Sequence, residues 1–314
     1  MIRRLRYSVE YAAVEAVRGA LRWLPHVAAE ALGTAIGTLF YLFDARHRRL
    51  AIANLRAAFP SRSPAECRAI ARRTFAHFGR LLTALLKFST MTPDRMRRRV
   101  EFGGAERVAA AHAAGRGVLL FTGHFGYWEL NALVHPLELT PLAVVARALD
   151  NPYLHALLER VRSATGNSVI YKLGAVRRIL RVLNANGTVA LLIDQHIQTD
   201  AVIVDFFNRP ASTTAALAAI AARTRAPVIP VFALPLPHGR YRMVYEHPVD
   251  PPSSENPEAL REFTQRCTDV LEMYVRRYPH LWLWMHRRWR DVEAVAAGVP
   301  GMFPAASRDN GVDT

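Results

Sequence analysis

The stretch GVLLFTGHFGYWEL, residues 117–130, carries the two patterns that decide the fold. Its first part, GVLLF at 117–121, is a short apolar run of the kind that forms a buried strand. The residues that follow have helical character, and the glycines Gly123 and Gly126 allow the chain to turn sharply between the two. Ligand sites of parallel α/β sheets lie where strands end. We therefore expect His124, which stands in this turn, to belong to a site.

Downstream of this stretch, short apolar runs continue to alternate with helical segments. Such alternation indicates a mostly parallel sheet that is covered by helices on both faces, an α/β fold. We expect strands at 117–121, 141–146, 188–193, 227–232 and 241–247, and helices from about 126 and 152 and at 173–186, 214–224 and 255–278.

Upstream, the sequence is helical and has a membrane-associated character. Helices are expected at 45–57 and 63–89, and apolar residues recur at helical spacing from the first residues onward. Residues 24–43 approach the length needed to cross a bilayer. Arginines on both flanks favour, by a small margin, helices that lie in the membrane interface over a single span. We expect membrane-anchoring helices at 1–44, a second domain at 45–290 and a flexible tail at 291–314.

The charge is concentrated at one end of the chain. Of the net +15, residues 1–100 carry +13, with 19 basic and 6 acidic side chains. Such a surface suits an anionic membrane, an acidic carrier protein or nucleic acid. No motif for reading nucleic acid accompanies it, so we expect no nucleic-acid partner. Two widely separated cysteines, Cys67 and Cys267, indicate neither a disulfide framework nor a metal site.

His124 and Glu129 together suggest a general base. On one continuous helix, five residues at about 100° each would place the two side chains roughly 140° apart, beyond contact. The glycine turn removes this obstacle, and a carboxylate on one imidazole nitrogen leaves the other free to accept a proton. The alternative is a core histidine beside an acid that favours a helix start.

The sequence offers no obvious nucleophile of its own. No G-x-S-x-G motif occurs, and no serine or cysteine stands out. The simplest consequence is that the nucleophile is a hydroxyl of the substrate. With an activated acyl thioester nearby, a pair of histidine and carboxylate could catalyse direct acyl transfer without an acyl-enzyme.

The segment Gly123-His-Phe-Gly-Tyr-Trp-Glu129 resembles the H-x4-D/E block of the glycerolipid acyltransferase superfamily, specifically the late lauroyl and myristoyl acyltransferases of lipid A synthesis. Further blocks of that family are matched in order over about 45–290, which implies that 45–290 is an acyltransferase domain. They are Arg49–Leu55 with Phe59-Pro60, Arg147 with Asp150-Asn151-Pro152, Asp194-Gln195, Val204–Phe207, Ala211–Thr214 and Trp282–Trp289.

The resemblance implies that His124 is the base and Glu129 its partner. It also implies that Arg147 meets the phosphorylated acceptor or the donor, as a guanidinium suits phosphate. Arg160 and Arg162 are further candidates, with an exposed helical face as the alternative.

Two more residues of these blocks are assigned to the substrate cleft. Asn151 belongs to the second block and is expected to bind substrate. Asp194 follows the strand expected at 188–193 and should line the same cleft, with a helix cap as its alternative role. The tryptophans of 282–290 suggest an interfacial belt, or packing under the N-terminal helices.

The resemblance implies acyl transfer to a phosphorylated glycolipid, a lipid A precursor above all, at the cytoplasmic face of the inner membrane. The co-substrate would be acyl carrier protein or coenzyme A carrying the acyl group, and membrane lipids would be partners. No cofactor or metal is implied. The alternatives are another lysophospholipid or glycolipid as acceptor, or a non-catalytic lipid-binding protein of the same fold.

Overall fold

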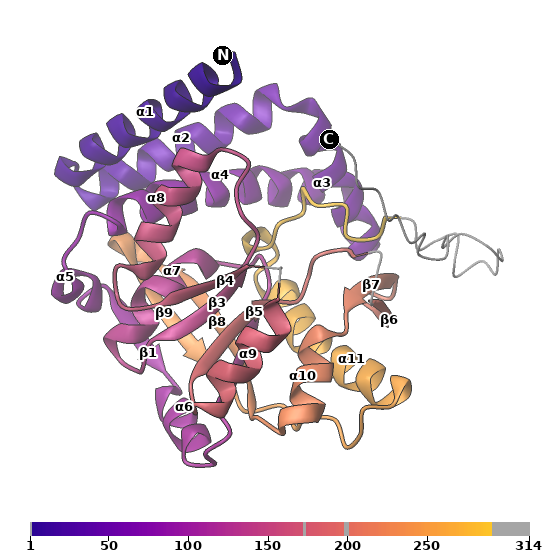
Figure 1. The fold of residues 1–314 in the computed structure, drawn as a ribbon. Helices are drawn as coiled ribbons and strands as arrows, with labels where there is room; N and C mark the ends of the chain where they lie inside the picture. The colour runs from indigo at the N-terminus through magenta and orange to yellow at the C-terminus, as the bar shows by residue number, and fades with distance from the viewer. Residues whose placement is uncertain (1, 172–173, 198–200, 291–314) are drawn as a thin grey trace, which may run out of the picture.

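The computed structural model describes residues 2–171, 174–197 and 201–290, and it has the expected α/β architecture (Figure 1). A seven-stranded sheet has the order β1-β9-β8-β2-β5-β3-β4, in which only the β8 and β9 pair is antiparallel. Its strands are β1 (Val100–Gly103), β2 (Val118–Thr122), β3 (Leu142–Ala146), β4 (Ser168–Tyr171), β5 (Thr188–Leu192), β8 (Val228–Leu236) and β9 (Arg240–Tyr245).

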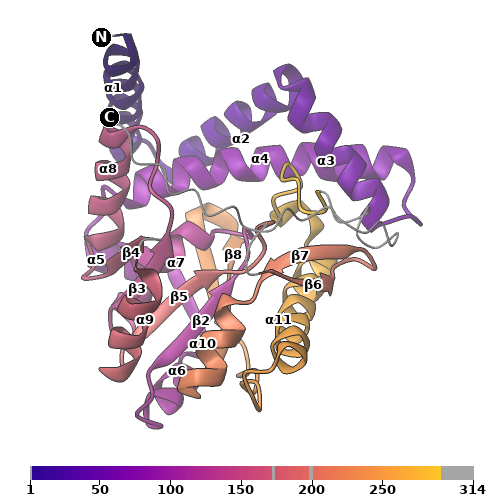
Figure 2. The ribbon, with the colours of Figure 1, turned by 45° about the vertical axis from the view of Figure 1, so that its right-hand side comes forward.

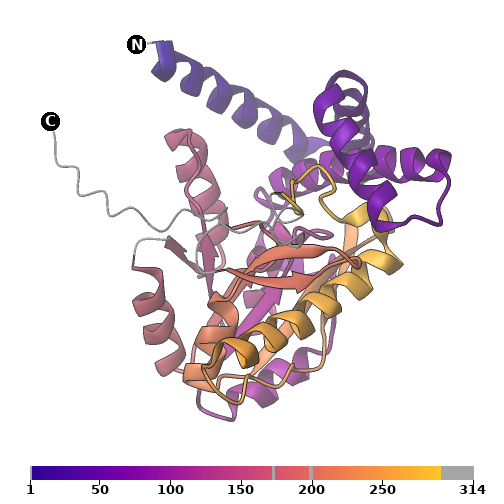
Figure 3. The same cartoon turned by 90° about the vertical axis from the view of Figure 1, so that its right-hand side faces the viewer.

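Helices cover both faces of the sheet. Successive strand residues point to opposite sides, and both sides are apolar, so each face packs against helices. In β2, Leu119 and Phe121 join one core with α9 (Ala175–Asn184), α10 (Ala216–Thr224) and α11 (Pro257–Arg277). Val118 and Leu120 join the other, with α6 (Ala105–His112), α7 (Trp128–Val134) and α8 (Pro152–Ser163). Figure 3 shows α10 and α11 together on their side of the sheet.

The N-terminal helices form a separate layer at one end of the sheet (Figure 2). They are α1 (Ile2–Trp23), α2 (His26–Phe43), α3 (Ala45–Ala58) and α4 (Pro64–Phe88), followed by the short α5 (Pro93–Arg97). A capping box of Ser63 and Glu66 begins α4, at the start of the helix expected at 63–89. His77 of α4 donates a hydrogen bond to the Gly126 carbonyl at 3.1 Å, which joins this layer to the turn after β2.

Helices α2 and α4 touch at backbone distance. A Cβ on Gly79 would lie 2.0 Å from the Gly33 carbonyl oxygen, and one on Gly37 would lie 2.1 Å from the carbonyl oxygen of Phe75. Only glycine fits at these positions. Further along, the Lys87 ammonium donates to the carbonyls of Leu21 and Leu24, so the contact continues to the start of α2.

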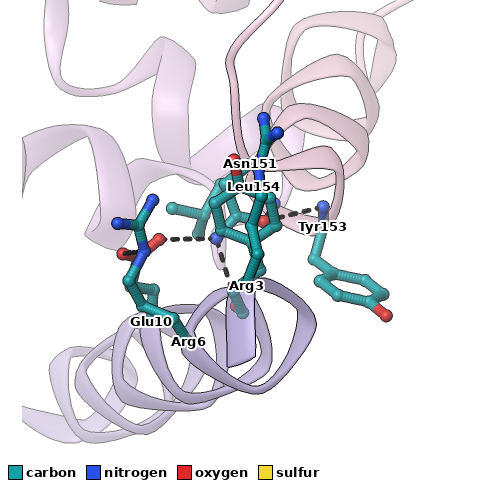
Figure 4. Close-up of polar contacts among 7 residues, drawn as sticks. Arg3, Arg6, Glu10, Asn151, Tyr153 and Leu154 are labelled. Carbon is teal, nitrogen blue, oxygen red and sulfur yellow. Dashed lines mark hydrogen bonds and ion pairs between the residues drawn. The ribbon is translucent and has the colours of Figure 1, made fainter. Parts of the chain in front are cut away.

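Helix α1 is held by the N-terminus of α8 (Figure 4). The Asn151 carboxamide oxygen accepts from the backbone amides of Tyr153 and Leu154 and so caps α8. Its nitrogen donates to the Tyr7 carbonyl at 3.1 Å and to Glu10 at 2.8 Å. One buried side chain therefore joins α8 to α1.

Most expected elements are present, with bounds that differ by a few residues. Strands β1 and β4 and the antiparallel hairpin of β6 (Ala201–Asp205) and β7 (Pro210–Thr214) were not expected. The expectation of a membrane belt in 282–290 is wrong, because Trp282, Trp284 and Trp289 are buried and pack on one another. The expected tail at 291–314 lies outside the described residues.

Among the described residues, one helix is long and apolar enough to cross a membrane by length and composition. It is His26–Phe43, of which 17% is buried. Large apolar side chains are exposed along it, including Leu39, Phe40 and Phe43, and Trp23 precedes it.

Candidate active site

The turn after β2 is built around two glycines whose positions exclude any side chain. Gly126 has a φ of +59°, and a Cβ there would lie 1.9 Å from the Ala233 carbonyl oxygen. A Cβ on Gly123 would lie 2.8 Å from a carboxylate oxygen of Asp194. The turn therefore brings the backbone close to both β8 and the end of β5, and it presents His124 between them.

The carboxylate that holds His124 belongs to Asp194. Asp194 accepts from His124 Nδ1 at 2.8 Å and from the His124 backbone amide at 2.7 Å. Trp282 Nε1 donates to the same carboxylate at 2.8 Å. Asp194 is 3% exposed and the His124 side chain 15%, so the imidazole has one buried nitrogen and one near the surface. Asp194 therefore lies against His124 at the end of β5, and its expected contact with substrate stays a prediction.

The electrostatics of the pair favour a charged imidazole. Burial lowers the pKa of His124, but the charge and hydrogen bond of Asp194, with the charge of Glu129, outweigh it and raise the pKa above 6.5. Burial alone would raise the pKa of Asp194, yet the charge and hydrogen bonds of His124 and the bond from Trp282 lower it to about 2. Asp194 therefore stays ionised, and Nδ1–H of His124 stays directed at it.

The predicted hydrogen bond between Glu129 and His124 is wrong. Glu129 lies in the first turn of α7, where it accepts from Arg162 of α8 at 2.8 and 2.9 Å. The Arg162 residue is 9% exposed, so this is a largely buried pair that joins α7 to α8. Helix α7 begins only at Trp128, and its direction points Glu129 toward α8. Glu129 acts on His124 through its charge.

The other predicted substrate-binding residues lie outside this cluster. Arg147 is 79% exposed and lies 3.7 Å from Asp150. Arg160 is exposed, and its only described polar contact is with the Tyr11 hydroxyl at 3.4 Å. Asn151 is engaged as the cap of α8, and Arg162 is engaged by Glu129. Substrate binding by these four residues stays a prediction.

Three residues that were not assigned to the site from sequence complete the surroundings of His124. The Gln195 amide lies 3.4 Å from Nε2 and can donate to it. The Trp128 ring packs edge-on against the imidazole at 5.2 Å between centroids. Trp282 supports the carboxylate. Gln195 and Trp282 lie in the sequence blocks that resemble the family. The blocks therefore indicated which segments form the site, but not the role of each residue in it.

An apolar cavity of about 460 Å³ opens beside this cluster. Phe78 of α4 lines it and packs on Trp128, while Leu283 lines it and donates its backbone amide to the His124 carbonyl. The remaining walls come mainly from α2, α4 and the segment after Trp282, namely Ile36, Gly37, Phe40, Asp44, His47, Phe75, Gly79, Leu82, Met285 and His286. Among the described residues, no cluster of three His, Cys, Asp or Glu side chains suits a metal ion.

The family profile described as bacterial lipid A biosynthesis acyltransferase matches residues 2–291. The chain belongs to this family. It is therefore an acyltransferase, and membership supports a lipid A-like acceptor. The profile includes the N-terminal helices, which agrees with their close packing on α4.

Curated relatives agree with this membership. The chain is 26% identical to the lipid A biosynthesis lauroyltransferase of Escherichia coli, over 89% of this chain and 90% of that protein. It is 24% identical to the myristoyltransferase of the same organism, over 76% and 73%. A phosphatidylinositol mannoside acyltransferase of Mycolicibacterium smegmatis is also 24% identical, over 69% and 71%.

Proposed function

We propose that this acyltransferase moves a fatty acyl group from a thioester to a hydroxyl of a phosphorylated glycolipid, most plainly a lipid A precursor, with His124 as the general base. The observation that carries the proposal is the Asp194–His124 pair. Its buried Nδ1–H···carboxylate bond fixes the tautomer and leaves Nε2 as the acceptor on the accessible side.

The reaction needs only this chain's residues and its two substrates. His124 Nε2 takes the proton of the acceptor hydroxyl as its oxygen attacks the thioester carbonyl. A C–O bond forms, the C–S bond breaks, and the imidazolium returns its proton to the departing thiolate. Asp194 stabilises the imidazolium during this step, and the charge of Glu129 does so from further away. The thiol is that of acyl carrier protein or coenzyme A, and no cofactor takes part.

The apolar cavity supports the acyl part of this proposal. It is lined mainly by aromatic and aliphatic side chains, and it adjoins the backbone of His124 through Leu283. A fatty chain lying there would bring its carbonyl toward the imidazole. The cavity is also bordered by α2, whose outer surface exposes Leu39, Phe40 and Phe43. We therefore place the protein on the cytoplasmic face of the inner membrane, where both substrates are available.

Replacement of the base tests the proposal. We expect purified His124→Ala to lose about 100-fold or more of its transfer rate, because general-base catalysis typically contributes that much. The measurement is mass spectrometry of the lipid product with a panel of acyl thioesters and acceptors. His247→Ala is the control, since His247 is exposed and contacts Arg107 on α6. Near-normal turnover of His124→Ala would contradict the assignment.

A further inference from the structure

A second pocket, of about 820 Å³, lies between the α1–α2 turn, the end of α4, α5 and the start of β9. Its walls carry an unusual number of cations, namely Arg22, Lys87, Arg95, Arg98, Arg99 and Arg240. We call it the basic pocket. Lys87 follows Phe78 of the active-site cavity by nine residues on α4, which amounts to about 14 Å along the helix axis. The basic pocket is therefore separate from the His124 cluster.

Carboxylates neutralise only part of this charge. Arg240 pairs with Glu101, and Glu30 lies close enough to Arg99 to act on its charge. Among the described residues, Arg22, Arg95 and Arg98 have no carboxylate within ion-pair distance, although Asp94 directly precedes Arg95 in sequence. Cations gathered in one concavity without matching anions repel one another, and a bound anion relieves that repulsion.

Lys87 adds a buried donor to the pocket. Its side chain lines the pocket although the residue is 5% exposed, and it donates to two backbone carbonyls, of Leu21 and Leu24. An ammonium has three N–H groups, so one remains without a described partner. Burial and then the charge of Arg99 lower the pKa of Lys87, and burial and then Arg99 and Lys87 lower that of His26 to about 4. The pocket is short of negative charge at its centre.

The surroundings of the pocket indicate a lipid. Arg22 and His26 line its wall in the α1–α2 turn, next to Trp23, which is 81% exposed, and Val27, which is 61% exposed. Guanidinium groups bind phosphate oxygens in pairs, while an exposed tryptophan beside them suits headgroup depth. A free anion would need the cations but not the apolar rim.

We propose that the basic pocket binds the phosphate-bearing headgroup of an anionic membrane lipid, apart from the reacting acceptor. Arg95 and Arg98 of the α5 region hold the phosphate together with Lys87, and Trp23 contacts the start of the acyl chains. Such binding fixes the α1–α2 turn at the membrane surface. It does not require acyl transfer, so His124→Ala retains it.

The test uses a soluble lipid, so that the general field of a membrane surface does not contribute. Dihexanoyl phosphatidylglycerol is titrated by calorimetry against the purified full chain, with inorganic phosphate in a parallel titration. For Arg95→Glu/Arg98→Glu we expect a loss of affinity for this lipid of about 10-fold or more. The matched control is Arg177→Glu/Arg178→Glu, two adjacent exposed arginines on α9 with no described carboxylate partner.

Vesicles of phosphatidylcholine with and without phosphatidylglycerol give the second readout, with the α5 variant losing its preference for the anionic vesicles. Arg95→Gln/Arg98→Gln, which should behave as the charge reversal does, guards against misfolding. Equal losses of lipid affinity in the α5 and α9 variants would show that general surface charge, and not the basic pocket, causes binding. That result would overturn the proposal. Inorganic phosphate that binds as tightly as the lipid would also overturn the proposal. So would an Arg95→Glu/Arg98→Glu variant that loses binding to an acidic acyl carrier protein while its lipid binding is unchanged.

Discussion

Two carboxylates lie near His124, and they act on it in different ways. Asp194 touches the imidazole and the backbone of the same residue, whereas Glu129 is bound to Arg162 and is felt at His124 only as a charge. A contact fixes the tautomer as well as the charge, while a distant charge stabilises only the protonated form. Removal of the two groups should therefore have unequal effects.

For Asp194→Asn we expect a fall in kcat of between about 10²- and 10⁴-fold with little change in KM, because the amide no longer holds Nδ1–H and the wrong tautomer becomes accessible. Glu129→Gln should lower kcat by a smaller factor, since it removes only a distant charge and weakens the contact with Arg162. Steady-state kinetics on both variants, with melting temperatures to check folding, decides the matter. A larger loss of kcat in Glu129→Gln would return the partner role to Glu129.

The pH profile should report the same difference. The base works when Nε2 is unprotonated, so kcat/KM falls as the pH drops through the pKa of His124, which is raised above 6.5. Because the Asp194 carboxylate raises this pKa, Asp194→Asn should move the acid limb to lower pH. Glu129→Gln should move it in the same direction by a smaller amount. An unshifted limb in Asp194→Asn would show that another group controls it.

The partner of His124 illustrates what a sequence can and cannot reveal at this scale. His124 itself is marked by the strand, the turn and the glycines, all of which are local. Asp194 is 70 residues away, and it reaches His124 because β2 and β5 are neighbours, with Thr122 paired to Leu192. Local sequence patterns do not reveal the order of strands in a sheet. The sequence therefore favours Glu129, which is close to His124 in the chain, as its partner.

At the scale of elements, local signals predicted helices better than short strands. The Ser63 cap with Pro64 and Glu66 marks the start of α4 directly. The hairpin of β6 and β7 has no such signal, because PASTT at 210–214 is too polar to suggest a strand without its partner. The close contact of α2 with α4 was also not predicted, since single glycines in two distant helices are uninformative until the helices are paired.

The glycine contact between α2 and α4 predicts a specific instability. Gly79→Ala should destabilise the protein by about 2 kcal/mol or more, because the new Cβ meets rigid backbone of α2 and the helices must separate. Gly19→Ala is the control. Gly19 lies in α1, where a Cβ would have nothing within 4 Å, so the change should be neutral or stabilise by about 0.5–1 kcal/mol. Thermal melts of the two variants should move apart, and equal melting temperatures would contradict the close packing.

At the scale of the whole molecule, the packing of α2 bears on how the protein meets the membrane. Contacts with α4 run from Leu24, in the turn before α2, through Gly33 and Gly37 to Tyr41. A span by α2 would carry α4 into the bilayer with it, and α4 contains the charged residues Arg68, Arg72, Arg73, Arg80 and Lys87. We infer that α2 lies in the interface, with its exposed side toward lipid.

This orientation can be tested without deleting helices that the core needs. We expect Trp23→Ser/Phe43→Ser to bind vesicles of bacterial lipids about 10-fold or more weakly, because two large side chains no longer enter the bilayer. Trp23, the last residue of α1, is 81% exposed, and Phe43, the last residue of α2, is 82% exposed. Met273→Ser on α11, 54% exposed, is the control. Unchanged vesicle flotation of the double variant would contradict the interfacial placement.

Helix α8 links α1 to the surroundings of His124. Asn151, at its N-terminus, donates hydrogen bonds to α1, and Arg162, near its C-terminus, donates to Glu129. The two residues are separated by roughly 16 Å along the helix axis. A helix that is bound at both ends transmits a displacement from one contact to the other. A displacement of α1 would therefore reach Glu129, whose charge adds to that of Asp194 in raising the pKa of His124.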